Sequence, residues 1–222
     1  MEKEGIFVMQ FPYVMDLLDK NLFDTIYHEH LSYFSLKSLL KLSEKSDLGI
    51  FDIQRNDLDG GAIRVFWKKG EGTRNKINKK NINKILGEEK RYGLYKKETY
   101  SKFADRIKAL KIDFLQKINY LKKKKKRIVG YGAAAKANVL LNYFGLDTKT
   151  IDYIVDSTPY KQGLFTPGTH IPIYSEEKIY DNIPDYILIF AWNFSQEIIK
   201  KNRKYKKSGG KFILVEPKMQ II

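Results

Sequence analysis

Two of the three histidines in this sequence, His28 and His30, lie two residues apart among other side chains that can carry protons. Glu29 stands between them, and Tyr27 and Tyr33 lie on either side. Histidine is the side chain whose unperturbed pKa lies nearest neutrality, so a histidine beside a carboxylate and phenols suits general acid or base catalysis. The same residue types also suit half of a metal site or a polar loop held by hydrogen bonds, and by themselves they leave these three interpretations open.

A glycine-rich stretch, Gly130–Ala135, follows a short apolar run and precedes a helical pattern. Its spacing is Gly-x-Gly-x-x-Ala, in which glycines let the backbone approach a phosphate and free amides at the helix start favour an anion. Asp156 ends the next predicted strand, as an acidic residue does in dinucleotide-binding domains. The pattern alone therefore leaves an NAD-binding domain open.

Two lysines near this loop favour a nucleotide-sugar over NAD. Lys136 and Asn138 lie in the first helical turn after the loop, where an ammonium can reach a pyrophosphate as a point charge. Lys161 follows the strand that ends at Asp156 and is a second candidate phosphate ligand. Each lysine is equally compatible with a surface charge, and the whole region with a Rossmann-like scaffold that binds no nucleotide.

Several motifs in a fixed order resemble those of S-adenosylmethionine-dependent sugar C-methyltransferases, which act on nucleotide-linked keto-sugars. The stretch Phe-Asp-Thr-Ile-Tyr-His-Glu-His-Leu-Ser-Tyr-Phe-Ser at residues 23–35 is similar to the signature of that family. The resemblance extends from residue 5 to about residue 217. The other matching segments are Phe11–Tyr13, Gly60–Arg64, Gly130–Asn138, Thr158–Gly163 and Pro167–Pro172.

The resemblance implies methylation of a carbon next to a ketone, with S-adenosylmethionine as the methyl donor. It implies that His30 is the general base, that Tyr27 stabilises the enolate or positions the sugar, and that Glu29 orients the loop. It also places the glycine loop in a C-terminal domain that closes over the sugar-nucleotide. The substrate-binding residues that it implies are Gly130, Tyr131, Gly132, Lys136, Asn138 and Lys161.

Family members carry a cysteine-rich zinc module and a cofactor-binding glycine loop ahead of these motifs, whereas this sequence contains no cysteine. We therefore expect a portion of such an enzyme that is inactive without the missing amino-terminal half, with cofactor-binding residues unknown and no metal. Expected partners are a nucleotide-diphosphate keto-sugar and a separate chain carrying the cofactor domain. An NAD-binding Rossmann oxidoreductase or module and an inactive remnant are the alternatives.

Composition indicates a folded, cytoplasmic protein. The 222 residues are 43% hydrophobic and 14% aromatic, no apolar run is long enough to span a membrane, and the start has no signal-peptide pattern. The net charge of +15 is concentrated in lysine runs that lack interleaved aromatic residues, which argues against a nucleic-acid partner.

The hydrophobic pattern predicts an α/β chain, in which the end of a class I methyltransferase sheet precedes a Rossmann-like parallel-sheet domain. We place the domains at residues 1–72 and 73–222, with a charged connector at residues 68–91. The expected strands are 5–11 (buried), 50–54, 62–67, 128–129, 151–156, 185–192 and 211–215. The expected helices are 13–20, 35–46, 98–124, 133–144 and 195–206.

Overall fold

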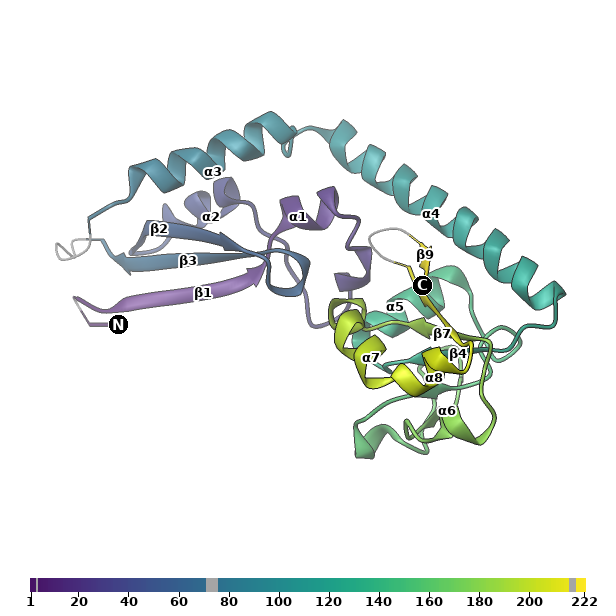
Figure 1. Ribbon diagram of the computed structural model, residues 1–222. Helices are drawn as coiled ribbons and strands as arrows, with labels where there is room; N and C mark the ends of the chain where they lie inside the picture. Colours follow the sequence, from purple (N-terminus) through teal and green to yellow (C-terminus); the bar gives the residue numbers. More distant parts are fainter. Residues whose placement is uncertain (3, 71–75, 216–218) are drawn as a thin grey trace. The chain divides into compact units, whose positions relative to one another are not determined.

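The computed structural model describes residues 1–2, 4–70, 76–215 and 219–222, and the chain divides into two compact units. Unit 1 comprises Met1–Leu22 and His30–Ala104, and unit 2 comprises Phe23–Glu29 and Asp105–Ile222. Figure 1 labels the helices α1 to α8 and several of the strands. The predicted domain boundary between residues 72 and 73 lies outside the described residues, so it stays a prediction.

Unit 1 is built on an antiparallel sheet in the strand order β1-β3-β2. In β3 the buried side chains of Ile63, Val65 and Trp67 alternate with more exposed ones, the period-two pattern of a half-buried strand. Helices α2 and α3 lie over one face of this sheet (Figure 1). The elements are β1 (Ile6–Pro12), α1 (Val14–Asp19), α2 (Leu36–Ser43), β2 (Leu48–Asn56), η2 (Leu58–Gly60), β3 (Ala62–Lys69) and α3 (Lys79–Tyr92).

Strand β1 is not the buried strand that its apolar run predicts. It pairs antiparallel with β3, and it is an edge strand of the described sheet. Ile6, Phe7 and Val8 are 50%, 44% and 47% exposed. The prediction of burial is wrong because no described strand or helix covers the outer side of β1. The free edge leaves backbone amides and carbonyls available for pairing with another strand.

The Gly60–Gly61 motif is explained by a buried carboxylate in unit 1 that is paired with a partly exposed arginine. Asp16 is 1% exposed and accepts hydrogen bonds from Nε and Nη2 of Arg55 at 3.0 and 2.6 Å. A Cβ atom on Gly61 would lie 2.4 Å from Cγ of Asp16, and the backbone there has a φ of +149°. Only glycine therefore fits between this turn and the paired carboxylate.

The region predicted as a connector contains helix α3, so that prediction is wrong. Asn78 caps the helix by accepting a hydrogen bond from the backbone amide of Asn81 at 3.2 Å. Ile85 and Glu89, four residues apart, are the buried side chains of α3. The error arose because charged residues cover the other sides of α3 and conceal the narrow buried stripe.

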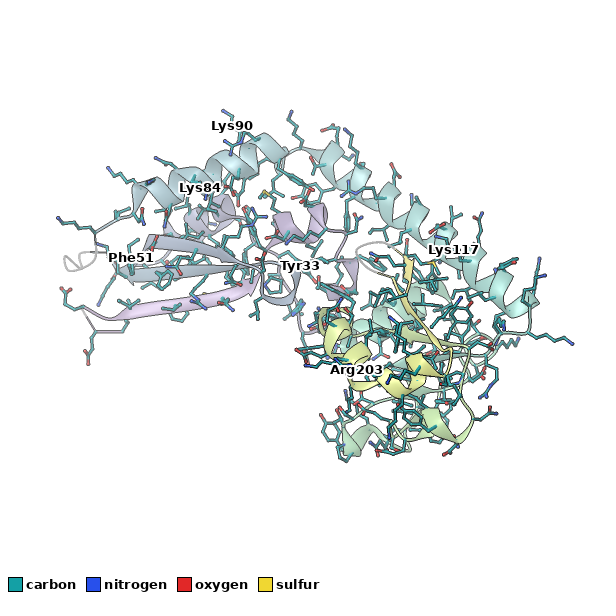
Figure 2. All side chains as sticks on the ribbon, viewed as in Figure 1. Tyr33, Phe51, Lys84, Lys90, Lys117 and Arg203 are labelled. Carbon is teal, nitrogen blue, oxygen red and sulfur yellow. The ribbon has the colours of Figure 1, made fainter. Side chains whose placement is uncertain are left out.

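Helix α4 (Lys97–Lys123) confirms the predicted long amphipathic helix. Its first residues belong to unit 1 and the rest, from Asp105, to unit 2. Exposed lysines such as Lys90 on α3 and Lys117 on α4 carry much of the positive charge (Figure 2). The buried side chains of α4 are Ile107, Phe114, Ile118 and Leu121.

Unit 2 contains a six-stranded sheet in the order β6-β5-β4-β7-β8-β9. All neighbouring strands are parallel except β8 and β9. This alternation of strands and helices around a mainly parallel sheet confirms the predicted Rossmann-like α/β fold. The strands are β4 (Ile128–Tyr131), β5 (Ile154–Val155), β6 (Ile173–Tyr174), β7 (Tyr186–Ile189), β8 (Lys211–Leu214) and β9 (Gln220–Ile221).

The helices of unit 2 differ from the prediction in two respects, because α6 (Lys178–Asp181) was not expected and one expected helix is divided. The single helix expected over residues 195–206 is divided into α7 and α8, between which the buried Asn202 donates a hydrogen bond to the carbonyl of Ile198 at 2.9 Å. The helical elements are η1 (Phe23–Thr25), α5 (Ala135–Phe144), η3 (Pro159–Lys161), α6 (Lys178–Asp181), η4 (Trp192–Phe194), α7 (Ser195–Lys201) and α8 (Arg203–Lys207).

Candidate functional site

The histidine stretch is divided between the two units. Residues Phe23–Glu29 belong to unit 2, and His30 begins the second part of unit 1. Tyr27 is half-buried, whereas His28 and Glu29 are exposed in the turn that follows η1. The ring centroids of Tyr27 and His28 lie 6.2 Å apart. The structure thus shows Tyr27 and Glu29 in one compact unit and His30 in the other.

Within unit 1, the segment after His30 runs beside the carboxyl end of β1. Phe34 forms a parallel bridge with Tyr13, and its ring lies 5.3 Å from that of Phe11. His30 is half-buried, and its ring centroid lies 6.5 Å from that of Tyr33, which is labelled in Figure 2. The segment that follows the predicted base thus packs at the carboxyl end of β1, and the ring of His30 itself lies near Tyr33.

A fully buried carboxylate, Glu89, fixes the helix that follows the His30 segment. Its Oε1 accepts from the hydroxyl of Tyr13 at 2.8 Å and from the amide of Leu36 at 2.6 Å. Its Oε2 accepts from the amide of Lys37 at 3.3 Å and from the hydroxyl of Tyr95. Burial above all, and then the Glu89 carboxylate, raises the pKa of both phenols, so both remain protonated donors.

In unit 2, the first glycine of the fingerprint is required by packing. Gly130 lies inside β4, where a Cβ atom would come within 2.7 Å of side-chain atoms of Ile154 and of Phe190. Gly132 follows β4 and has a φ of +93°, a backbone conformation that glycine adopts readily. The geometry therefore accounts for Gly130 without a ligand.

Asp156 and Lys161 hold the glycine loop in place. Oδ2 of Asp156 accepts from the amide of Ala133 at 2.7 Å, and Oδ1 accepts from the amide of Thr158 at 2.8 Å. Burial acts to raise the pKa of Asp156, but these bonds and the charge of Lys161 hold it below its ordinary value. Nζ of Lys161 lies 3.6 Å from Asp156 and donates to the carbonyl of Ala133 at 3.0 Å. Lys161 is therefore paired within the protein.

A pocket of about 310 Å³ opens at the carboxyl ends of the parallel strands in unit 2. Strands β5 and β6 lie on one side of β4, and the chain then continues with β7 on the other side. The pocket lies at this reversal of strand order, the usual ligand position in open α/β sheets. The hydroxyl of Tyr131 donates to Glu176 at 2.5 Å, and Glu176 is paired with Lys201. Lining residues include Tyr131, Gly132, Asp156, Glu176, Ala191 and Lys201.

Burial, followed by the hydrogen bond to Glu176, raises the pKa of Tyr131. The pocket thus offers neutral hydroxyls and carboxylates, groups that hydrogen-bond the hydroxyls of a sugar or ribose. Two predicted substrate-binding residues, Tyr131 and Gly132, line it. The other four, which are Gly130, Lys136, Asn138 and Lys161, are not among the described residues that line it.

Lys136 lies beside this pocket in a different environment. Its Nζ is buried, has no hydrogen-bond partner among the residues that the structure describes, and lies 4.9 Å from the ring centroid of Trp192. Asn138, half-buried, is two residues further along α5. Trp192 was not among the predicted site residues, because a lone tryptophan after a strand carries no motif.

The start of the histidine stretch is anchored on the same tryptophan. Asp24 is fully buried, and its Oδ2 accepts a hydrogen bond from Nε1 of Trp192 at 2.6 Å. The ring of Phe23 packs against Tyr143 and Phe144 of α5, with centroids 5.4 and 5.8 Å apart. Two residues of the signature motif are therefore part of the packing of unit 2.

The described residues contain neither a metal-ligand cluster nor a helix that could span a membrane. No group of three histidine, aspartate or glutamate side chains in the described part of the chain is placed to hold a metal ion. None of the described helices is long and apolar enough to cross a membrane.

A parallel-sheet unit with a polar pocket at its switch point defines an α/β protein of the kind that binds small molecules beyond its strand ends. Residues 57–217 match the family model described as the C-methyltransferase C-terminal domain. The chain belongs to this C-methyltransferase family, as its motifs predict. It is 36% identical over 219 residues to C-methyltransferase NovU of Streptomyces niveus, covering 99% of this chain and 52% of that protein. The chain thus spans about half the length of the curated relative that it matches.

Proposed function

We propose that this chain is a portion of an S-adenosylmethionine-dependent C-methyltransferase that acts on a nucleotide-linked keto-sugar. In this proposal unit 2 binds the nucleotide-diphosphate part of the substrate, and His30 removes a proton from a sugar carbon. Family membership supports the reaction class. The observation that carries the substrate class is the buried ammonium of Lys136, which has no hydrogen-bond partner among the described residues.

A buried cation without a hydrogen-bonding partner is costly, and the face of Trp192 offsets only part of that cost. Lys136 is the second residue of α5, and the N-cap position of that helix is Ala134, whose side chain cannot cap the first-turn amides. An anion in this region would therefore meet an ammonium and the positive end of a helix dipole. A diphosphate supplies that anion, and the adjoining pocket offers partners for sugar hydroxyls.

In the proposed reaction the neutral imidazole of His30 takes a proton from the carbon next to the ketone. The C–H bond breaks, an N–H bond forms, and the electron pair becomes an enolate whose oxygen carries the charge. The hydroxyl of Tyr27 would donate a hydrogen bond to that oxygen or position the sugar, and Glu29 would orient the loop. The enolate carbon is then the nucleophile for methylation.

S-Adenosylmethionine would supply the methyl group, but the described residues do not provide its binding loop. The glycine fingerprint of this chain lies in unit 2, where the Ala133 amide is already bonded to Asp156. We therefore propose that the cofactor is bound by another part of the enzyme or by a separate chain. The exposed edge of β1 is where a strand from that part would extend the sheet of unit 1.

Calorimetric titration of this chain tests the substrate class. We expect inorganic pyrophosphate, dTDP or GDP to bind, and Lys136→Met to weaken that binding by about tenfold or more, because a charge-assisted contact is lost. Lys111→Met is the matched control, since Nζ of Lys111 lies 4.8 Å from the ring centroid of Tyr143 elsewhere on the unit. Preferential binding of NAD would replace this proposal with an NAD-binding module. Micromolar binding of S-adenosylmethionine by this chain would contradict the assignment of the cofactor elsewhere.

Proton exchange tests the proposed base without methyl transfer. In the complete enzyme we expect the proton next to the ketone to exchange with D₂O, as followed by NMR. His30→Ala should slow this exchange by roughly 10² to 10⁴, the usual contribution of a general base. His28→Ala, in the exposed neighbouring position, is the control. Equal exchange rates in the His30→Ala and parent enzymes would exclude His30 as the base.

A further inference from the structure

Trp192 of unit 2 contacts both the predicted phosphate ligand Lys136 and the histidine stretch. One face of its indole lies 4.9 Å from Nζ of Lys136. Its Nε1 donates to the fully buried carboxylate of Asp24 at 2.6 Å. A single rigid side chain therefore connects α5 with the segment Phe23–Glu29.

The segment beyond Asp24 consists of short turns. These turns contain hydrogen bonds from the amide of Ile26 to the carbonyl of Phe23 at 3.0 Å and from the amide of Tyr27 to the carbonyl of Thr25 at 3.2 Å. Ile26 is 48% exposed although it is apolar. The start of the segment is held by two contacts, the packing of Phe23 on α5 and the hydrogen bond from the indole to Asp24, and the second depends on the orientation of the indole.

The cation on the ring influences both sides of this connection. An ammonium over an indole face is attracted to the ring and polarises it, which strengthens the N–H as a hydrogen-bond donor. A diphosphate that binds the ammonium of Lys136 competes with the ring for the same charge. Occupancy of the anion site therefore changes the forces that hold Trp192 and, through its N–H, Asp24.

We propose that Trp192 is a positioning residue that couples diphosphate binding at Lys136 to the placement of Phe23–Glu29, the segment that carries Tyr27 and Glu29. This inference rests on the proposed function, because it takes the diphosphate of a nucleotide-sugar as the anion. Trp192 and Asp24 do not touch the reacting carbon in this proposal. They determine where the segment lies when the substrate is bound.

Fluorescence of Trp192 provides a spectroscopic test, because the chain contains two tryptophans and Trp67→Phe leaves Trp192 as the single indole. An ammonium against an excited indole quenches its emission. Titration of the Trp67→Phe protein with pyrophosphate or dTDP should therefore give a saturable rise in emission. Lys136→Met should abolish this response, and Lys111→Met should leave it unchanged.

Hydrogen exchange tests the coupling to the segment. In the parent protein, saturating dTDP should change the exchange rates of the amides of residues 26–29. In Asp24→Asn and in Trp192→Phe, each of which weakens or removes the indole-to-carboxylate hydrogen bond, dTDP should still bind but these rates should no longer respond to it. Circular dichroism and the urea midpoint of each variant show whether unit 2 remains folded.

The possible outcomes separate the two proposals. Calorimetric binding of dTDP without a change in Trp192 emission, or with a response of residues 26–29 that persists in Asp24→Asn, overturns the coupling but leaves the phosphate site intact. Absence of binding by pyrophosphate, dTDP and GDP in the parent protein overturns both the proposed phosphate site and the coupling.

Discussion

Substitution of the buried Glu89 by alanine is expected to destabilise unit 1 more than single substitutions on the exposed side of α3. The carboxylate is completely buried and accepts four hydrogen bonds, two from tyrosine hydroxyls and two from amides at the start of α2. Alanine would leave the Tyr13 hydroxyl and the Leu36 amide buried without an acceptor, each at a cost of about 1–3 kcal/mol before relaxation, whereas water can reach the two part-buried donors. Allowing for water entry, we expect a loss of roughly 3–5 kcal/mol in the free energy of unfolding, as for other broken buried networks.

Urea denaturation followed by tryptophan emission measures this loss. Trp67 lies in β3 of unit 1 and is 2% exposed, so in a Trp192→Phe background the emission reports unit 1 alone. With a urea m-value of about 2 kcal/mol/M, a loss of about 4 kcal/mol lowers the midpoint by about 2 M. Glu89→Gln keeps the shape and one carbonyl acceptor, so a smaller decrease of about 1–3 kcal/mol is expected.

Glu88→Ala is the matched control, one residue earlier on the same helix. Glu88 pairs with Arg55 at 3.3 Å, and both side chains are partly exposed, so its loss should cost less than about 1 kcal/mol. If Glu89→Ala were as mild as Glu88→Ala, the buried network would not stabilise the helix start. Glu89 would then not be the residue that holds the segment after His30 in place.

Two further substitutions test unit 2. Asp156→Asn should lower the free energy of unfolding by about 1–3 kcal/mol at neutral pH. The pKa of Asp156 is lower in the folded than in the unfolded protein, so the stability difference between parent and variant is fully present above the unfolded-state pKa of about 4. It should disappear as the pH falls through the folded-state pKa. A difference that does not change with pH would contradict the role of the Asp156 charge. Gly130→Ala should cost about 1–3 kcal/mol because its Cβ would press on Phe190, as calorimetric melting would show. Gly49→Ala, which has open space around the new Cβ, is its control, and equal melting temperatures for the two would refute the packing argument.

The periodic patterns predicted the elements that bury a regular stripe of apolar residues. The long helix α4 and the strands β4, β5, β7 and β8 fall near their predicted positions because their apolar runs are clear, whereas the two-residue strands β6 and β9 were not predicted. Helix α3 was missed since its buried face consists of Ile85 and a glutamate, and hydrophobicity cannot indicate that a carboxylate is buried. Strand β1 was read as buried from its composition, which says nothing about whether a neighbouring strand is present.

The candidate site was predicted in part, for a similar reason. The glycine fingerprint located the loop at the pocket, because that spacing reflects local backbone geometry. It could not show that Lys161 pairs with Asp156 while the ammonium of Lys136 lies against an indole, because these contacts depend on tertiary packing. Trp192 and Asp24 are 168 positions apart, so no local pattern could indicate their hydrogen bond.

The membership of Phe23–Glu29 in unit 2 affects how such proteins can be recombined. A chimera that takes only residues 105–222 from a relative would keep residues 23–29 of the original protein. Phe23 and Asp24 of the original protein would then have to pack against α5 and the Trp192 position of the relative. Successful grafts would have to transplant both pieces together. When unit 2 is exchanged in evolution, substitutions near residues 23–29 should therefore accompany substitutions in residues 105–222.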